Sequence, residues 1–426
     1  AQAIAQFPSI MGWPAQNNPY FSSIWGFDLP ATPTPLAPYA GMDNDFVYNP
    51  LNGDFPVVQL RGIPSFVPAE IIWCVFNDNG GPHANSNGKP LKVEIQLTVW
   101  AFNCPDQHLM NNTLFTSHKI INRATEITDS TFLGIWTDVD LGCYLDDYVG
   151  SNPSLNTMYA YNQDAVDGQP GSTCQGVPTF ANVAPAQSVT FLNHPLDKFV
   201  AYNNSGSGIP AGTTGPIAPA EYYNYLTGSW RDGTPLTYGG SGYNPANPGA
   251  APVSHSFPEP PNDPNGWSMC TAGLPFGDRI MIGTTNLGQL LPGQIEELVT
   301  AWAFHPNPSL PCGIGTTLSD VAAIQALYDG GFKSVCSPIS KAPELPADSL
   351  DLFPNPTAGT AILRYGKLTP LSLRAFDAAG RLVLERTKGF EKEETKIETA
   401  ALASGIYTLY IVTELGTATK KLAVLR

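Results

Sequence analysis

The first third of the chain contains a run of long segments rich in apolar, β-branched and aromatic residues, which predict β-strands. Residues 78–90 interrupt this run with Asn and Gly, and these residues predict a loop with tight turns. The predicted strands are residues 70–77, 92–103, 113–122 and 131–137. Strands of this length and spacing indicate a sheet-on-sheet architecture with a sizeable core.

At the end of the chain, apolar and polar residues alternate, and this pattern predicts a small antiparallel sandwich. Residues 377–380 (DAAG) are interpreted as a hairpin turn in which Gly380 takes a positive φ without steric cost. The predicted strands are residues 360–365, 371–376, 405–412 and 420–425. Between these two regions, apolar residues at helical spacing predict one short helix at residues 317–328, which ends at Gly330 and Gly331.

Composition agrees with a chain built from strands and long loops. It contains 40 Gly and 41 Pro in 426 residues, with 17 Tyr, 20 Phe and only 13% charged residues. We therefore predict an all-β fold: a large, loop-rich β-sandwich body followed by a small immunoglobulin-like β-sandwich. No apolar run reaches about 18 residues, so no transmembrane helix is expected. The chain begins at Ala1 without a signal peptide, as expected of a mature product.

Charge changes sharply near residue 340. Residues 1–339 carry 9 Lys or Arg and 26 Asp or Glu, a net charge of −17, whereas the remainder carries 12 basic and 10 acidic residues, a net charge of +2. Pro-containing residues 337–348 are predicted to be a linker, which makes residues 1–336 the ectodomain and residues 349–426 a separate module. Because the body is acidic, nucleic acid is excluded as a partner.

The seven cysteines all precede the C-terminal module. Disulfides are expected in an exported chain, and an odd number leaves one thiol unpaired or intermolecular. Proximity in the sequence favours the pairs Cys143–Cys174 and Cys74–Cys104, and Cys312 and Cys336 flank the predicted helix and would staple it. The cysteines lack the close spacing of a zinc site.

Six carboxylates lie within 30 residues without an intervening Lys or Arg. The six residues are Asp138, Asp140, Asp146, Asp147, Asp164 and Asp167. Calcium is the cation expected here, because it takes six to eight hard oxygen ligands on flexible loops. The spacing is not that of an EF-hand, since Gly142 occupies the position of a third ligand. Solvated turns capped by Asp remain the alternative.

Catalytic signatures are weak in this sequence. Residues 239–243 (GGSGY) lack the final glycine of a nucleophile elbow, and neither a Walker loop nor a zinc-protease motif is present. Asp146 and Asp147 are a poor acid–base pair, because adjacent residues of a strand point to opposite faces. The six histidines are dispersed. A hydrolase with two distant carboxylates remains a minor alternative.

Aromatic residues crowd one Gly- and Pro-rich region. They include Tyr222, Tyr223, Tyr225, Trp230 and Tyr238. If exposed, these rings would stack on sugar rings or form a protein interface. If buried, which is the favoured interpretation, they would form the core of a layer of loops.

The C-terminal module resembles the type A sorting domain of the type IX secretion system of the Bacteroidota. Four blocks occur in the family's order: LFPNPT from residue 352, FDAAGRLV from residue 376, LASGIYTL from residue 402 and KKLAVLR from residue 420. The residues that carry this resemblance are Pro354, Asn355, Pro356, Gly380, Gly405, Tyr407, Lys420 and Lys421. It implies export by the type IX secretion machinery to the extracellular space or outer-membrane surface.

The body is similar to uncharacterised ectodomains of Bacteroidota surface proteins that carry the same tail. Matching segments include residues 136–142 (WTDVDLG), 146–150 (DDYVG) and 230–235 (WRDGTP). This resemblance implies no activity. The sequence therefore predicts a non-enzymatic structural or adhesive protein of the cell surface, with copies of itself or other outer-membrane proteins as partners. A glycan-binding module is the alternative.

Overall fold

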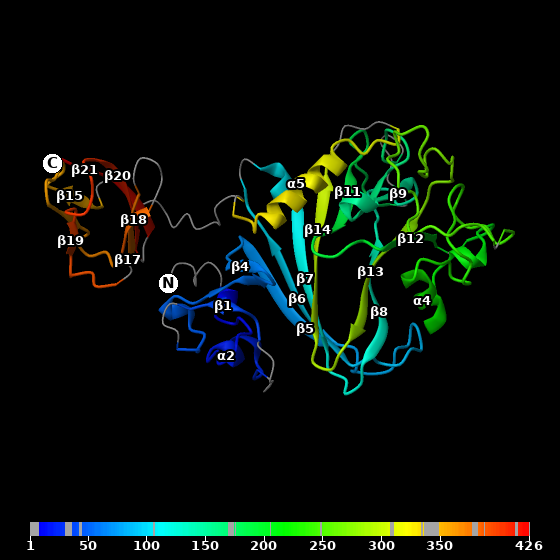
Figure 1. Cartoon of the computed structure of the whole chain (residues 1–426), viewed down its shortest axis with the longest axis horizontal. Helices are drawn as coiled ribbons and strands as arrows, with labels where there is room; N and C mark the ends of the chain where they lie inside the picture. The colour runs from blue at the N-terminus through cyan, green and yellow to red at the C-terminus, as the bar shows by residue number, and fades with distance from the viewer. Residues whose placement is uncertain are drawn as a thin grey trace. The chain divides into compact units, whose positions relative to one another are not determined.

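A computed structural model of the whole chain divides into two compact units (Figure 1). One unit contains Ala1–Leu36, Ala40–Phe55 and Ser337–Arg426, and the other contains Ala37–Tyr39 and Pro56–Cys336. The structure describes all residues except 1–7, 30–35, 42–44, 105–106, 169–173, 175, 205, 248, 307–310, 334, 336–348, 377–381, 387, 414–415 and 426. The predicted linker and the predicted turn at Gly380 lie outside the described residues.

The larger unit, called the body below, contains an antiparallel seven-stranded sheet. Its strands in spatial order are β5 (Glu70–Asn77), β6 (Val93–Ala101), β7 (Thr113–Asn122), β14 (Ile295–His305), β11 (Ala186–Phe191), β10 (Thr157–Asn162) and β9 (Asp147–Asn152). β14 lies between β7 and β11, although about 180 residues separate it from β7 in the sequence. The strands that the sequence predicts at residues 70–77 and 113–122 are present with the same bounds.

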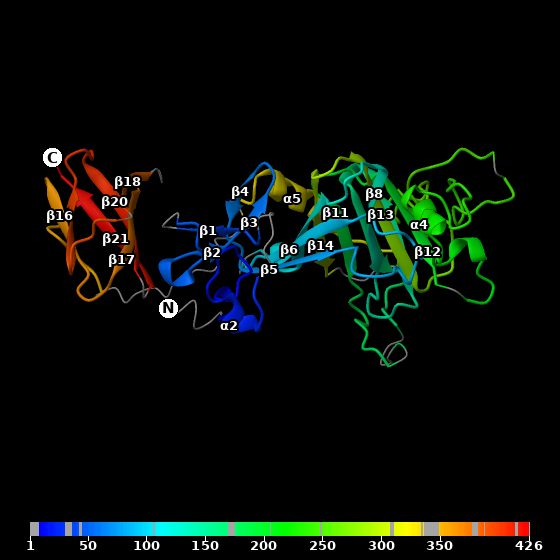
Figure 2. The same cartoon turned by 90° about the horizontal axis from the view of Figure 1, so that it is seen from below.

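A second, three-stranded antiparallel sheet packs on one face of the seven-stranded sheet (Figure 2). Its order is β12 (Lys198–Asn203), β13 (Arg279–Leu290) and β8 (Thr128–Asp138). Their shared core joins Met158 and Val189 of the large sheet to Phe199, Met281 and Ile135 of the small one. The prediction of an all-β sandwich body is therefore confirmed.

Helix α5 (Thr317–Asp329) covers the opposite face of the seven-stranded sheet, where Figure 1 shows it crossing beside β14 and β11. Ile324 and Tyr328 of α5 pack against Trp100, Phe115 and Val299. The predicted helix at residues 317–328 is thus present. The structure contains more helices than the one predicted. The additional helices are α2 (Phe21–Trp25), α3 (His108–Asn111) and α4 (Pro219–Leu226).

Short elements complete the two units. They are the strands β1 (Tyr39–Ala40), β2 (Phe55–Pro56), β3 (Val58–Leu60) and β4 (Ile63–Phe66), and the 3₁₀ turns η1 (Pro8–Ile10), η2 (Pro50–Asn52), η3 (Pro153–Leu155) and η4 (Ala211–Thr213). In the N-terminal segment, Tyr48 is fully buried and its hydroxyl donates to the carbonyl of Ile10.

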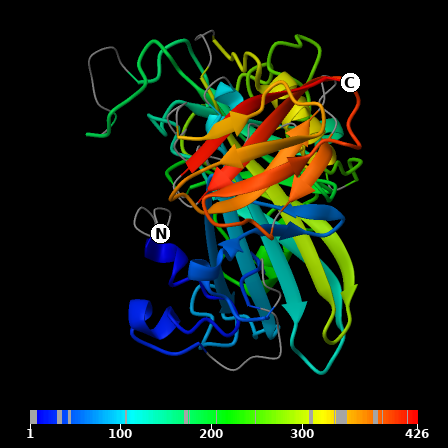
Figure 3. The ribbon, with the colours of Figure 1, turned by 90° about the vertical axis from the view of Figure 1, so that its left-hand side faces the viewer.

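The C-terminal module contains two antiparallel sheets (Figure 3). One consists of β15 (Asp351–Phe353), β16 (Thr360–Arg364) and β19 (Glu394–Glu398), and the other of β18 (Leu382–Arg386), β17 (Pro370–Phe376), β20 (Gly405–Thr413) and β21 (Gly416–Val424). Leu363 and Ile397 of the first sheet share a core with Leu373, Leu409 and Leu422 of the second. The predicted small antiparallel sandwich is present, with its strands within a few residues of the predicted bounds.

Candidate metal centre

Four polar side chains form a buried group at one edge of the seven-stranded sheet, called the inner cluster below. Asp147 begins β9 and Asn162 ends β10, and the two residues are directly opposed in the ladder. Asp146 lies in the turn before β9, and Asp167 lies in the loop after β10. Each of the four residues is at most 9% exposed. Three of the six predicted calcium ligands therefore share one enclosed region with an amide that the prediction did not include.

Backbone N–H groups satisfy part of the inner cluster. Both oxygens of Asp167 accept hydrogen bonds, whereas Asp146 and Asp147 each accept through Oδ2 only. The donors are the N–H groups of Cys143 and Phe180 for Asp167, of Gly168 for Asp146, and of Leu141 for Asp147. These bonds fix the loops on both sides of β9 and β10 around the carboxylates.

Three oxygens of the inner cluster have no hydrogen-bond partner among the described residues. They are Oδ1 of Asp146, Oδ1 of Asp147 and Oδ1 of Asn162. A buried polar atom without a partner costs about 1–3 kcal/mol, and more when it carries charge. Unpartnered carboxylate and amide oxygens are ligands that a hard cation takes, although oxygens of Asp146, Asp147 and Asp167 do not converge within 4.8 Å of one another.

Burial and mutual repulsion raise the pKa of two carboxyl groups of the inner cluster, those of Asp146 and Asp147. Burial raises the pKa of Asp146 to about 6, with further increases from the charges of Asp167 and Asp164. Burial also raises the pKa of Asp147 well above its usual value, and the charges of Asp146, Asp167 and Asp140 act in the same direction. Without a cation, burial and repulsion therefore favour the protonated forms of Asp146 and Asp147.

The loop around the inner cluster depends on Gly142 and on one disulfide. Gly142 has φ = 73°, and a Cβ at this position would overlap the carboxylate of Asp167. The disulfide Cys143–Cys174, with its Cα atoms 5.2 Å apart, joins the loop that precedes β9 to the loop that follows β10. This pairing was predicted correctly.

The other disulfide predictions were wrong. Cys312 pairs with Cys270, whose position 42 residues away in the sequence gave no sign of proximity. Cys104 is disulfide-bonded, whereas Cys74 is a free, exposed thiol on β5. Neighbours in the sequence are thus poor guides here, because the sheets bring together segments from distant parts of the chain.

A second acidic group, the outer cluster, lies on the surface. It contains Asp138 and Asp140, which were predicted ligands, and Asp278, which was not. One carboxylate oxygen from each residue lies within 4.8 Å of the others. Asp138 and Asp140 are exposed and Asp278 is half-buried. Asp278 lies about 140 residues from its neighbours, next to the end of β13 that pairs with Asp138, so only the sheet register brings it here.

The sixth predicted ligand, Asp164, belongs to neither cluster. It is exposed, and its Oδ1 accepts hydrogen bonds from the N–H of Val166 at 2.8 Å and the amide of Asn162 at 3.3 Å. These contacts are those of an Asp that caps a turn. The predicted set of six therefore separates into three inner residues, two outer residues and one turn residue.

The structure also contains a Ser–His–Asp arrangement that sequence spacing did not reveal. Ser188 and His305 are hydrogen-bonded at 2.9 Å between Oγ and Nε2, and His305 Nδ1 contacts the Asp320 carboxylate at 2.9 Å. Burial lowers the pKa of His305. Ser188 is fully buried and His305 is 1% exposed. A nucleophile needs access to its substrate, so these contacts join β11 and β14 to α5.

Most of the loop aromatics are structural. Tyr225 and Trp230 are at most 3% exposed, and Tyr225 stacks on Tyr202 with ring centroids 4.7 Å apart. Tyr222 is half-buried, whereas Tyr223 and Tyr238 are 43% and 57% exposed. The favoured interpretation of buried rings therefore describes the centre of this region and not its periphery.

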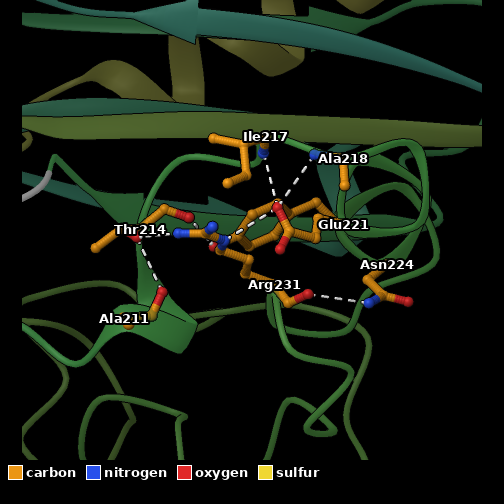
Figure 4. A network of polar contacts seen from close by, with 8 residues as sticks. Ala211, Thr214, Ile217, Ala218, Glu221, Asn224 and Arg231 are labelled. Atoms are coloured by element: carbon orange, nitrogen blue, oxygen red, sulfur yellow. Dashed lines mark hydrogen bonds and ion pairs between the residues drawn. The ribbon is translucent and has the colours of Figure 1, made fainter. Parts of the chain in front are cut away.

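One ion pair anchors α4 within the same layer of loops (Figure 4). The Glu221 carboxylate pairs with Arg231 at 3.1 Å and accepts from the N–H groups of Ile217 and Ala218. The N–H of Ile217, followed by Arg231 and then by the N–H of Ala218, lowers the pKa of Glu221. Arg231 also donates to Thr214 Oγ1 at 2.9 Å. Because its Oε2 binds Arg231 and two backbone donors, Glu221 holds α4 in place.

The residues that carried the sorting resemblance lie mostly around β20 and β21. Asn355 donates to the carbonyl of Lys421 and accepts from the N–H of Ala423. Pro354 and Pro356 flank Asn355 and follow cis peptide bonds. Gly405 begins β20, and the buried Tyr407 donates its hydroxyl to the carbonyl of Ala403. Lys420 and Lys421 lie on β21, where Lys421 Nζ contacts Thr408 Oγ1 at 2.7 Å.

Together, the sandwich body and the small C-terminal sandwich define a β-protein of modular construction. Residues 351–425 match the family of secretion system C-terminal sorting domains, so the tail is a type IX secretion sorting domain and places the protein in the Bacteroidota. The protein is therefore exported to the extracellular space or the outer surface. Within the described part of the chain, helices are too short or too polar to span a membrane.

The remaining comparisons carry no argument about function. No curated protein matches the chain. Among solved structures, a polysaccharide lyase is 8% identical with a TM-score of 0.25 over 87% of this chain, and a β-glucuronidase from Ruminococcus gnavus is 10% identical with a TM-score of 0.14 over 70%. This chain spans 38% of the lyase and 46% of the glucuronidase. A carbohydrate-binding and INT domain pair of ZmpB from Clostridium perfringens is 11% identical, with a TM-score of 0.15 over 90% of this chain and 98% of that pair.

Proposed function

We propose that this exported protein is a non-enzymatic structural or adhesive component of the cell surface, whose body is stabilised by calcium. The three unpartnered oxygens of Asp146, Asp147 and Asn162 carry the calcium part of the proposal. The sorting domain supports the location. A rigid, loop-rich body suits a protein that is held outside the cell and contacts copies of itself or other outer-membrane proteins.

Calcium is the preferred cation for the inner cluster because of its ligand chemistry. The cluster offers carboxylate and amide oxygens on loops, without an exposed thiol or imidazole that would favour a transition metal. A divalent cation would displace the protons of Asp146 and Asp147 and give their Oδ1 atoms a partner. Asn162, opposite Asp147 in the ladder, would supply a neutral oxygen.

Calcium titration of the purified protein tests this assignment directly. After treatment with EDTA, added calcium is expected to raise the melting temperature of the body in a saturable way, and magnesium is expected to do so less. Asp147→Asn is expected to abolish the response, whereas Asp164→Asn, a change at an exposed turn residue, is expected to preserve it. An unchanged melting temperature in the wild-type protein would refute calcium binding.

The surface-assembly part of the proposal is tested by native mass. Protein released gently from its own cells is expected to sediment as a large assembly that loosens when calcium is chelated. A monomer that is indifferent to chelator would contradict the assembly role. Because the titration uses purified protein, its result does not depend on whether an assembly exists.

The non-enzymatic part is tested at the buried triad. A fluorophosphonate probe, which labels activated serines, is expected to leave Ser188 unmodified in the folded protein. Ser188→Ala is expected to affect stability only, because the change removes a hydrogen bond to His305. Labelling of Ser188 that is lost on mild denaturation would instead identify a hydrolase.

A further inference from the structure

The three-stranded sheet covers only part of the face on which it packs, and the uncovered part contains a hollow of about 290 Å³. The hollow is lined by residues of β6, β7, β11 and β14 together with Asn112, which precedes β7. Its apolar surface comes mainly from Leu114, Trp302 and Phe304. Leu114 is 53% exposed, and the two rings are partly exposed. We call this group the aromatic shelf.

Sheet register arranges the aromatic shelf in two rows. Leu114 is directly opposed to Trp302, and Gln187 is directly opposed to Phe304. The N–H of Phe304 donates to the carbonyl of Asn112 on its other side. The Phe304 ring is therefore flanked by one amide residue on each neighbouring segment, and the indole ring lies in the adjacent row.

Some polar groups on the aromatic shelf already form hydrogen bonds within the protein, and others do not. The Trp302 indole N–H donates to Thr300 Oγ1 at 3.0 Å, and that hydroxyl contacts Thr116 Oγ1 at 2.6 Å, so the ring is held against the sheet. In the described part of the chain, the side-chain amides of Asn112 and Gln187 make no hydrogen bond and are half-buried. Each amide therefore offers both donors and acceptors to a ligand.

Charge narrows the choice of ligand. The seven residues that line the hollow are uncharged, and residues 1–339 of the chain carry a net charge of −17. A polyanion would find no cation here and would be repelled by the body. Aromatic faces stack on apolar faces, and amides hydrogen-bond hydroxyl groups, so the surface matches a ligand with an apolar ring face and hydroxyl groups on its edge.

We propose that the aromatic shelf is a binding site for neutral glycans. Trp302 and Phe304 stack on sugar rings, and Asn112 and Gln187 hydrogen-bond the hydroxyl groups at the ring edges. The hollow is at the small end of ligand sites, so it accommodates a short stretch of glycan. This site differs from the exposed loop rings Tyr223 and Tyr238 and is independent of the proposed calcium site.

Isothermal titration of the full chain with oligosaccharides tests the proposal. The probes are cellohexaose, mannohexaose and xylohexaose as neutral glycans, and oligogalacturonate as the anionic control. Binding of at least one neutral hexamer is expected, without binding of the anionic oligomer. Trp302→Ala is expected to weaken binding about tenfold or more, which corresponds to about 1.4 kcal/mol. Because Trp302 is partly buried, Gln187→Ala, with an expected loss of about threefold or more, provides a second variant with little effect on packing.

Two control variants test whether glycan binding takes place at the aromatic shelf. Tyr238→Ala, at an exposed ring outside the shelf, and Asp164→Asn, at an exposed turn residue, are expected to bind as the wild type does. Absence of binding to all three neutral hexamers, or loss of binding in Tyr238→Ala with retention in Trp302→Ala, would overturn the proposal. It would also be overturned if Trp302→Ala changed only the native mass, since the shelf would then join two copies of the chain.

Discussion

The inner and outer acidic clusters are both formed by aspartates beside the same two sheets, yet their surroundings differ. Inner residues Asp146, Asp147 and Asp167 are at most 9% exposed, and backbone donors hold them. Asp138 and Asp140 of the outer cluster are exposed to water, although with Asp278 their oxygens converge within 4.8 Å. In the outer cluster, water screens part of the repulsion, although burial and the charges of Asp278 and Asp140 still raise the pKa of Asp138. In the inner cluster, a proton or a cation must offset the repulsion. Burial, more than the number of carboxylates, therefore decides where a cation is needed.

The largest expected effect comes from opening the loops around the inner cluster. Replacing Cys143 and Cys174 by Ala is expected to lower the free energy of unfolding by about 2–4 kcal/mol, because the bridge closes a long loop in the unfolded chain. The same change is expected to weaken calcium binding, since the bridge holds in place the loop whose Cys143 backbone N–H donates to Asp167. Chemical denaturation with and without calcium measures both effects.

The Cys270–Cys312 bridge provides the control for that experiment. Its removal is expected to cost a similar amount of stability, because its sequence separation of 42 is comparable to the 31 of the other bridge. Calcium binding is expected to survive in this variant. Equal loss of the calcium response in both variants would show that general destabilisation, and not the inner cluster, underlies it.

The next effect concerns Asp147→Asn. At a calcium concentration about 100 times the Kd, binding stabilises the wild type by about 2.7 kcal/mol, and the variant is expected to lack this gain. In EDTA the variant is expected to be as stable as the wild type or more so, since the amide avoids the burial of a charge. Urea unfolding in both buffers gives the comparison. A variant that is destabilised equally in both would contradict the role of Asp147 as a ligand.

The pH dependence of stability in EDTA further tests the difference between the inner and outer clusters. Because the folded-state pKa of Asp146 is raised to about 6 and that of Asp147 is raised well above its usual value, the folded protein binds more protons than the unfolded chain above pH 4. Stability is therefore expected to fall as the pH rises from about 4 through 6. His305, whose pKa burial lowers, acts in the opposite direction. The difference between the wild type and Asp146→Asn/Asp147→Asn isolates the carboxyl groups, and a difference that does not vary with pH would contradict the prediction.

The smallest effect is expected at the outer cluster. Asp138→Asn and Asp140→Asn are each expected to change stability by no more than about 0.5 kcal/mol, because both carboxylates are exposed and screened by water. The calcium response measured by melting temperature is expected to remain. If these variants lose the response and Asp147→Asn keeps it, the cation binds to the outer cluster and the comparison is reversed.

Sequence patterns predicted some strands of the body and missed others. β5 and β7 were predicted with their observed bounds, because β-branched and aromatic residues are concentrated in both segments. All six residues of β10 are buried, and most of β9 and β14 is buried too, so no alternation marks them. α4 was missed because its tyrosines resembled a binding surface more than a helix.

The candidate site was predicted in part for similar reasons. Asp146, Asp147 and Asp167 were found because carboxylates cluster in the sequence around them. Asn162 was missed because an amide carries no charge signal, and Asp278 was missed because only the register of β13 with β8 places it near Asp138. The aromatic shelf was not predicted, since its residues come from separate strands that meet only in the seven-stranded sheet.

The position of β14 has a consequence for how the body folds. β14 pairs with β7 on one side and β11 on the other, so the centre of the large sheet cannot close before residues near 300 are available. Pairings between such distant segments form slowly, because the long intervening loop must first be closed. Until then β7 and β11 have unpaired edges that are prone to aggregation. A chain that crosses the outer membrane therefore benefits from remaining unfolded until its second half has been delivered, and a truncated chain would lack the strand that completes its core.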